Sequence, residues 1–262
     1  MPLIVTRPAG QARPWLQALH AAGVDAAALP LIEIVPSPQP EAVRDAWRDL
    51  PSMAFAMFVS ANAVQHFFAL RPPGAAWPAS LQAGSTGPGT SGAMRAAGLS
   101  ASQVVTPDEA AGRFDSEALW ALIGSRPWQG TQVLVVRGED GRPWLAGRWQ
   151  QAGATVRFVA AYARRVPQPD AGGRALLERA CARPQEHVWH FSSGEAVQHL
   201  GTLVPGADWH AATALVTHER IADQARAAGF GRVRVVEAGV EAAAAALQAL
   251  AVETRSVQSG RS

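Results

Sequence analysis

The chain repeats itself at an offset of about half its length, and this feature constrains its fold more than any other. Four pairs of short runs match in the same order, at offsets of 130 to 133 positions. The pairs are Leu3–Arg7 with Leu134–Arg137, Ser60–Phe67 with Ser193–Leu200, Arg95–Leu99 with Arg226–Phe230, and Val104–Val105 with Val235–Val236. Each match is weak in an alanine-rich chain, but four in register predict a duplicated unit.

Each unit is expected to alternate strands and helices. Short β-branched runs end in small or polar residues and lead into helical segments. Pro14 and Pro143 suit a first helical turn, and Ser60 and Ser193 suit N-caps. The glycines expected in the left-handed position after a helix are Gly23, Gly98, Gly153 and Gly229. This alternation predicts parallel sheets with helices on both faces.

The order of the repeated runs predicts how the chain is divided. The N-terminal block pairs with a block in mid-chain, so one domain should be discontinuous, made of residues 1–36 and 167–262. Residues 40–163 should form an inserted continuous domain. The crossings, 34–40 and 164–169, are rich in proline and should be stiff and extended. We therefore expect two α/β domains with a cleft between them on a double hinge.

Composition excludes several classes of protein. The 262 residues are 48% hydrophobic and 17% charged, and no apolar run is long enough to span a membrane. The single cysteine, Cys181, excludes an internal disulfide framework. All 23 basic residues are arginine, but they form no stripe suited to nucleic acid, and the net charge is only +2. With no secretory leader apparent at the start, we expect a cytoplasmic protein without nucleic-acid or membrane partners.

A ligand is expected beyond the carboxyl ends of the strands, where helix N-termini present free N–H groups and arginines suit anions. For some of these positions, such as Ser60 and Ser193, a purely structural capping role stays open. The candidate binding residues are Thr6, Arg7, Ser60, Ala61, Asn62, Gly87, Thr90, Arg137, Gly138, Ser192, Ser193, Gly194, His218 and Arg220.

Two other kinds of site are less favoured. The run Gly87–Gly92 fits G-x-G-x-x-G, with Asp108 about 20 residues on, as in dinucleotide sites. However, Leu81–Thr86 looks like a poor strand, Pro88 occupies a tight-turn position, and His218–Ile221 in the other unit has no glycine. No metal site is expected, because the histidines of His187-x-x-His190 should face opposite sides of a strand and have no suitably spaced acidic partner.

Tyr162 is the only tyrosine and ends an apolar run just before the second crossing, which should place it near the cleft. A neutral phenol can donate a proton or a hydrogen bond at pH 7. A lone tyrosine is also a common packing residue. Position alone leaves both roles open.

Taken together, the motifs resemble those of the uroporphyrinogen-III synthase family. The likeness runs from Leu3 to about Leu250 and depends on the order and spacing of several short runs. These are Ile4–Pro8, Phe58–Val64, Gly87–Thr90, Val135–Glu139, Ala161–Arg164, Phe191–Ser193 and Val216–Ala222.

The resemblance implies two flavodoxin-like parallel-sheet domains joined by a two-stranded linker, and a reaction that needs no cofactor. Linear hydroxymethylbilane would lose water and close through a spiro intermediate, with its last pyrrole inverted, to give uroporphyrinogen III. Tyr162 would assist departure of the hydroxyl, and Thr90 matches a family threonine. Ile221 stands where a threonine can occur, so Arg220 is the better candidate for a substrate carboxylate there.

This interpretation predicts a cyclising hydro-lyase of haem biosynthesis that acts as a monomer on a small-molecule substrate with eight carboxylates. Two alternatives stay open. One is a hinged protein that binds a small anion without chemistry. The other is an NAD(P)-dependent oxidoreductase that uses the turn from Gly87 to Gly92.

Overall fold

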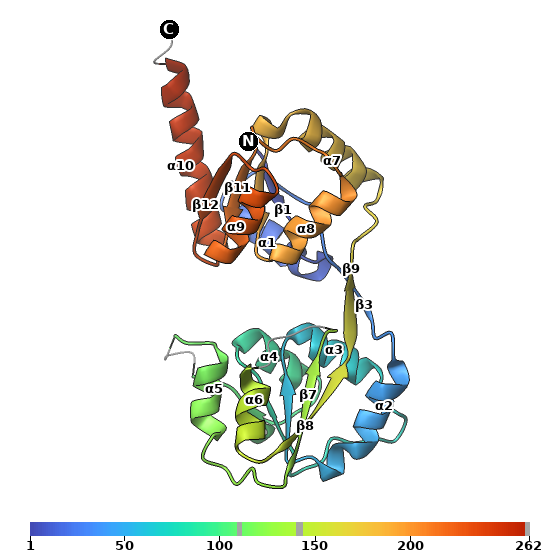
Figure 1. Ribbon diagram of the computed structural model, residues 1–262. Helices are drawn as coiled ribbons and strands as arrows, with labels where there is room; N and C mark the ends of the chain where they lie inside the picture. Colours follow the sequence, from blue (N-terminus) through green and yellow to red (C-terminus); the bar gives the residue numbers. More distant parts are fainter. Residues whose placement is uncertain (109–111, 140–143, 260–262) are drawn as a thin grey trace. The chain divides into compact units, whose positions relative to one another are not determined.

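The computed structural model describes residues 1–108, 112–139 and 144–259, with the backbone alone from residue 254 onward. The chain divides into two compact units (Figure 1). The first unit comprises Met1–Glu33 with Arg165–Ser262, and the second comprises Ile34–Arg164. In the described part of the chain, no helix is both long and apolar enough to cross a membrane.

The first unit is built on a five-stranded parallel sheet in the order β12-β11-β10-β1-β2. The strands are β1 (Leu3–Val5), β2 (Ala26–Ala28), β10 (Val188–Phe191), β11 (Thr213–Val216) and β12 (Arg232–Val235). One face packs on α1 (Ala9–Ala21) and α10 (Val240–Ser259). The other is covered by α7 (Ala171–Ala182), α8 (Gly194–Leu203) and α9 (Glu219–Ala227) (Figure 1).

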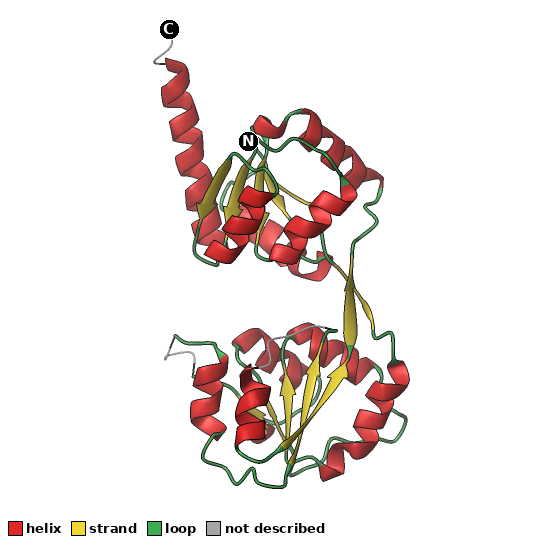
Figure 2. Ribbon diagram, viewed as in Figure 1, coloured by secondary structure: helices red, strands yellow, loops and turns green. Residues whose placement is uncertain are grey.

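The second unit has a parallel sheet of the same size, in the order β6-β5-β4-β7-β8. Its strands are β4 (Phe55–Phe58), β5 (Gln82–Gly84), β6 (Val104–Val105), β7 (Gln132–Arg137) and β8 (Thr155–Ala160). One face packs on α5 (Ser116–Ile123) and α6 (Trp144–Gln151). The other packs on α2 (Pro40–Asp49), α3 (Ala61–Ala69) and α4 (Pro88–Ala96) (Figure 2).

Two further strands, β3 (Glu33–Pro36) and β9 (Tyr162–Arg165), form a two-stranded sheet of their own. The described chain also has short 3-10 turns at Leu50–Ser52, Ala101–Gln103 and Pro184–Glu186. The predicted class, α/β with two parallel sheets, is confirmed.

The strand register confirms the sequence repeat. In both sheets the strand pairs align at constant offsets: 130 for β1 with β7, 133 for β10 with β4, and 131 for β11 with β5. One predicted pair is wrong by two residues. Through their neighbours Ala83 and Ala214, Val104 corresponds to Val233 rather than Val235. The sequence alignment is ambiguous here, because consecutive valines in a short edge strand match equally well in more than one register.

The two sheets have the same layout, but the strand that comes first along the chain occupies a different place in each. The first has the order 2-1-3-4-5, which is that of flavodoxin-like sheets, and the second has 3-2-1-4-5. The helices and strands from β1 to α5 recur from β7 to α10. Each half of the chain therefore gives its first strand, helix and strand to the sheet of the other half.

Most of the residues predicted to mark helix ends do so. Gly23, Gly98, Gly153 and Gly229 all adopt left-handed backbone angles, with φ from 74° to 102°. The Ser60 side chain caps α3, whereas Ser193 stands at the N-cap of α8 without a side-chain capping bond.

The prediction that Pro14 lies in a first helical turn is wrong, because α1 begins at Ala9 and Pro14 is its sixth residue. Proline cannot bond to the carbonyl four residues back, which belongs to Gly10, and Gly10 is exposed. Water can therefore satisfy that carbonyl. Pro143 lies outside the described residues.

Candidate functional site

The second unit brings three predicted site residues together where its strand order reverses, between β4 and β7. Ser60 follows β4, Gly138 follows β7, and Tyr162 begins β9. The Tyr162 hydroxyl lies 3.2 Å from the Ser60 Oγ, so the two share a hydrogen bond. Only 1% of Tyr162 is exposed, and its ring belongs to the core cluster on the α2–α3–α4 face. A crevice is expected at such a reversal because the connections leave in opposite directions.

Gly138 is fitted to the tyrosine ring. A Cβ at this position would lie 3.0 Å from the Tyr162 Cζ and 3.3 Å from its oxygen. Contacts this short would push the ring away, so a glycine is what lets the phenol rest against the backbone.

Ser60 has two roles at this point. Its Oγ accepts a hydrogen bond from the Ala63 N–H at 3.2 Å, which caps α3, and it also meets Tyr162. Ala61 and Asn62 form the first turn of α3 and are half-buried beside it. The capping role considered from the sequence is thus present together with a contact to the candidate catalytic group.

Two neighbours of Tyr162 were not predicted. The Arg164 Nη2 donates to the Tyr162 hydroxyl at 3.5 Å, and the His66 ring centroid lies 5.9 Å from the tyrosine ring. Burial lowers the pKa of His66, which favours its neutral form. The sequence could have indicated Arg164 as a neighbour of Tyr162, because residues two apart in a strand face the same side. His66 had none beyond its place on α3.

Arg137 is not brought to Tyr162, although Gly138 is its chain neighbour. Its guanidinium stacks on the Phe158 ring at 4.3 Å, beside Met57 and Val135 on the α5–α6 face. Consecutive residues at a strand end point to opposite faces, and this separates the two groups.

Gly87 and Thr90 lie at the start of α4, where Gly87 is the N-cap and the Thr90 N–H donates to the Gly87 carbonyl at 3.2 Å. Two objections to a dinucleotide turn here are wrong. Gln82–Gly84 does form a strand, β5, and Pro88 takes the first helical position, where a missing N–H costs nothing. The strand is only three residues long and includes a glycine, which made it hard to see.

In the first unit the strand order reverses between β1 and β10, beside Thr6 and Arg7. The buried Thr6 hydroxyl donates to the His190 carbonyl at 2.7 Å. The Arg7 guanidinium lies 4.3 Å from the Trp15 ring centroid, and burial lowers its pKa. The Arg7 Nε is buried and has no hydrogen-bond partner in the described chain.

His190 completes this cluster and was considered in the sequence only as a metal ligand. It is fully buried, its ring centroid is 4.6 Å from that of Trp15, and neither ring nitrogen has a hydrogen-bond partner among the described residues. Burial, and then the charge of Arg7, lower its pKa to about 4. His190 is therefore neutral at pH 7. The described residues contain no group of three potential metal ligands from His, Cys, Asp and Glu.

The remaining candidates lie at the carboxyl ends of β10 and β11. Ser192 and Ser193 are half-buried, and a Cβ on Gly194 would meet the Gln224 Oε1 at 1.5 Å. His218 caps α9 by accepting from the Arg220 N–H at 3.1 Å, and both side chains are exposed. Within each unit, helix N-termini and arginines thus share one edge of the sheet, an arrangement that can bind carboxylates.

Comparison with known proteins points to one family. The family model described as "Uroporphyrinogen-III synthase HemD" matches residues 14–245. The uroporphyrinogen-III synthase of Salmonella typhimurium (strain LT2) is 28% identical over 252 residues, covering 90% of this chain and 95% of its own length. That of Escherichia coli (strain K12) is 27% identical over 244 residues, with the same coverage.

Solved structures agree on the fold. A mutant uroporphyrinogen III synthase from the extremely thermophilic bacterium Thermus thermophilus aligns with a TM-score of 0.57 at 18% identity, covering 99% of both chains. The uroporphyrinogen-III synthetase of Helicobacter pylori 26695 aligns with a TM-score of 0.52 at 12% identity, covering 96% of this chain and 99% of its own. At these identities the likeness supports the architecture alone.

Proposed function

The chain belongs to the uroporphyrinogen-III synthase family, and on this premise we propose that it cyclises hydroxymethylbilane to uroporphyrinogen III. The observation that carries the proposal is the family match across residues 14–245. The reaction removes water and inverts the last pyrrole of a flexible, eight-carboxylate chain. Its main demand is that both ends of the substrate meet in one orientation, which is catalysis by positioning.

We propose that carboxylates of the substrate are held at the carboxyl edges of the two sheets. The backbone N–H groups that begin α3, α4, α8 and α9 suit anions, because helix N-termini carry partial positive charge. The proposed binding residues are Thr6, Arg7, Ser60, Ala61, Asn62, Gly87, Thr90, Arg137, Gly138, Ser192, Ser193, Gly194, His218 and Arg220. The exposed Arg220 and the stacked Arg7 and Arg137 supply the positive charge.

Tyr162 is proposed as the proton donor to the departing hydroxyl. As the carbon–oxygen bond breaks, the phenolic proton passes to the leaving oxygen and water departs. The resulting phenolate is stabilised by Arg164, whose Nη2 lies within hydrogen-bond reach of its oxygen. The proton returns when the cyclised product loses one. Because Tyr162 is almost fully buried, the leaving hydroxyl has to replace the Ser60 contact.

An isomer assay tests the overall proposal. Hydroxymethylbilane closes spontaneously to the type I isomer, so protein added to fresh substrate should shift the product to type III. Boiled protein serves as the control. An unchanged isomer ratio would remove the proposed activity.

The Tyr162→Phe variant tests the proton donor. Loss of the hydroxyl should lower kcat by about 10²-fold or more while KM changes little, because general acid catalysis contributes to the transition state. A variant that turns over at the full rate would leave Tyr162 as a packing residue only.

We also propose that the protein acts on this small molecule as a monomer in the cytoplasm. Sedimentation at micromolar concentration and cell fractionation check the two points, and a stable dimer or a membrane-bound fraction would contradict them.

A further inference from the structure

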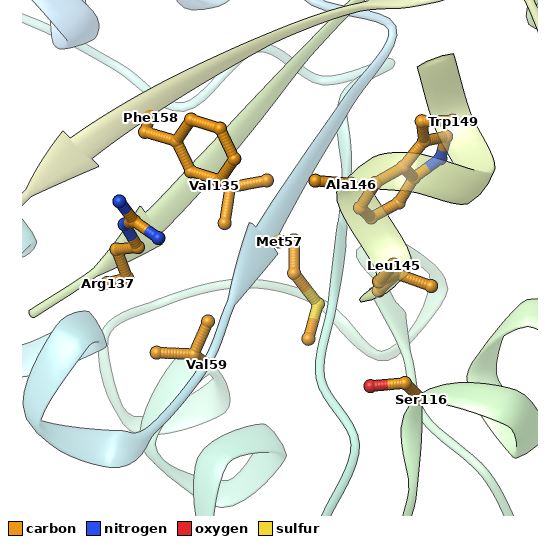
Figure 3. A pocket seen from close by; sticks show the side chains of 9 residues that line it. All are labelled: Met57, Val59, Ser116, Val135, Arg137, Leu145, Ala146, Trp149 and Phe158. Carbon is orange, nitrogen blue, oxygen red and sulfur yellow. The ribbon is translucent and has the colours of Figure 1, made fainter. Parts of the chain in front are cut away.

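A small pocket opens in the second unit at the carboxyl ends of β4 and β7. Its volume is about 50 Å³, more than the roughly 10–15 Å³ that a cavity needs to hold one water, and far too small for a whole tetrapyrrole. Most of its lining is apolar, including Met57, Leu145 and Trp149. Figure 3 shows these side chains gathered around the space, with the Arg137 guanidinium at one side and the Ser116 hydroxyl at another.

The cation at this pocket is held by stacking and not by an ion pair with another described residue. Arg137 is half-buried and stacks on Phe158, and it forms no ion pair in the part of the chain that the structure describes. Stacking fixes the plane of the guanidinium and leaves its N–H fork available for an anion. An apolar pocket with one oriented arginine suits a short carbon chain that ends in a carboxylate.

The repeat shows how the surroundings of this arginine differ from those of its equivalent in the first unit. At offsets of 130 and 133, Arg7 corresponds to Arg137 and His190 to Met57. In the first unit Arg7 stacks on Trp15, whose ring lies 4.6 Å from that of His190. At the offset of 130, Trp15 is replaced by Leu145, which removes the ring from the second unit.

Arg137 therefore uses another support, Phe158 on β8, at the same 4.3 Å that separates Arg7 from Trp15. Two rings lie beside the arginine in the first unit. In the second unit Leu145 is smaller than Trp15, and it lines the pocket together with Met57, which has no ring. The duplicated positions thus hold the same cation on different aromatic supports, and in the second unit it lines the pocket described here.

We propose that this pocket receives one short carboxylate arm of the substrate, with the carboxylate on Arg137 and its methylenes against Met57 and Trp149. This inference rests on the proposed function and adds a specific subsite to it. Phe158, which supports Arg137, and Ala146 become determinants of substrate affinity, although neither of them was predicted as a site residue.

The first experiment fills the pocket in one variant and removes its charge in another. Ala146→Leu places a larger side chain into the space, and Arg137→Gln removes the cation; each should raise KM for hydroxymethylbilane about 10-fold or more. The product should still be the type III isomer. Arg148→Gln is the matched control, because it removes an exposed positive charge from the helix that carries Ala146, and it should leave KM unchanged. An unchanged KM for a folded Ala146→Leu variant would overturn the subsite.

The second experiment reads the pocket directly and does not depend on turnover. The chain has four methionines, so methyl-labelled methionine gives few NMR signals, with Met53 and Met94 buried elsewhere as internal references. Titration with propionate should move the Met57 signal alone, saturably, and not in Arg137→Gln. A Met57 signal that stays fixed would refute the subsite even if Ala146→Leu failed to fold. Wild-type protein that forms no type III isomer would instead refute the proposed function.

Discussion

His190 is a buried base whose ring nitrogens have no hydrogen-bond partner in the described chain, and its burial makes stability depend on pH. Its pKa is about 4 in the folded protein, against an ordinary value of 6.5. Between these values the unfolded chain binds a proton that the folded chain does not, so stability falls as the pH drops from 6.5 to 4. The contribution is about 2 kcal/mol between pH 7 and pH 5, at about 1.4 kcal/mol per pKa unit.

Replacing His190 by the residue at the equivalent position of the other unit tests this. His190→Met should flatten the loss of stability between pH 7 and pH 5, measured by urea unfolding at both values. His210→Asn, at an exposed histidine, should keep the wild-type slope. Equal slopes for wild type and His190→Met would show that another group is responsible.

Gly138 offers a second prediction at this scale. Gly138→Ala should displace the Tyr162 ring, because the new Cβ would lie 3.0 Å from the ring carbon that bears the hydroxyl. We expect turnover to fall about 10-fold or more, since small misplacements of a reacting group are costly. Gly147→Ala, on α6 with nothing within 4 Å of the new atom, is the control. Full activity in Gly138→Ala would show that the ring position is not critical.

Sequence reasoning proposed Tyr162, Ser60 and Gly138 individually as site residues, but did not show that they meet. The order of residues along the chain does not show that Arg137 and Gly138, at the end of β7, face opposite sides of the sheet. Arg137 contacts Phe158, whereas Gly138 contacts Tyr162. His190 was considered for metal binding, yet its actual setting beside Trp15 and Arg7 depends on the packing of a helix against a strand. Such contacts are set by tertiary packing, which a single sequence does not reveal.

At the scale of helices and strands, the residue directly before β12, Gly231, has no room for a side chain. A Cβ on Gly231 would lie 1.8 Å from the His210 carbonyl oxygen, a backbone atom that cannot simply move aside. Gly231→Ala should therefore lower the free energy of unfolding by about 1–3 kcal/mol, as overpacking does. Chemical denaturation measures this, and a loss below about 0.5 kcal/mol would contradict it.

Gly201 is the matched control for that change. It lies in α8, is exposed, and has nothing within 4 Å of an added Cβ. Gly201→Ala should stabilise the protein by about 0.5–1 kcal/mol, because alanine is the better helix former. Changes of opposite sign in the free energy of unfolding for Gly231→Ala and Gly201→Ala would distinguish steric crowding from helix propensity.

The elements themselves were largely predictable, because the repeat supplied each one twice. Helix ends marked by Gly23, Gly98, Gly153 and Gly229 were correctly identified. The errors fell on α1, whose start lies upstream of Pro14, and on the short strands β5 and β6. Two- and three-residue strands with alanine, glycine or repeated valine carry little signal in period or propensity.

For the whole molecule, the two units differ in how the chain supplies them. Residues 34–164 are continuous and contain a complete five-stranded sheet with apolar clusters on both faces. We expect this fragment to fold alone with one cooperative thermal transition, because its core is self-contained. Circular dichroism on heating checks this, and a broad or absent transition would contradict it.

The exchange of the first strand, helix and strand between the halves has a consequence for where this chain can be broken. A cut in the connection between α5 and β7 would leave two fragments, each lacking a strand–helix–strand piece that the other carries. Neither should fold by itself, but mixed together they should complement one another and recover both sheets. A half-length ancestor would have met the same need by trading these pieces between two identical copies, so a symmetric pair could have preceded the single chain.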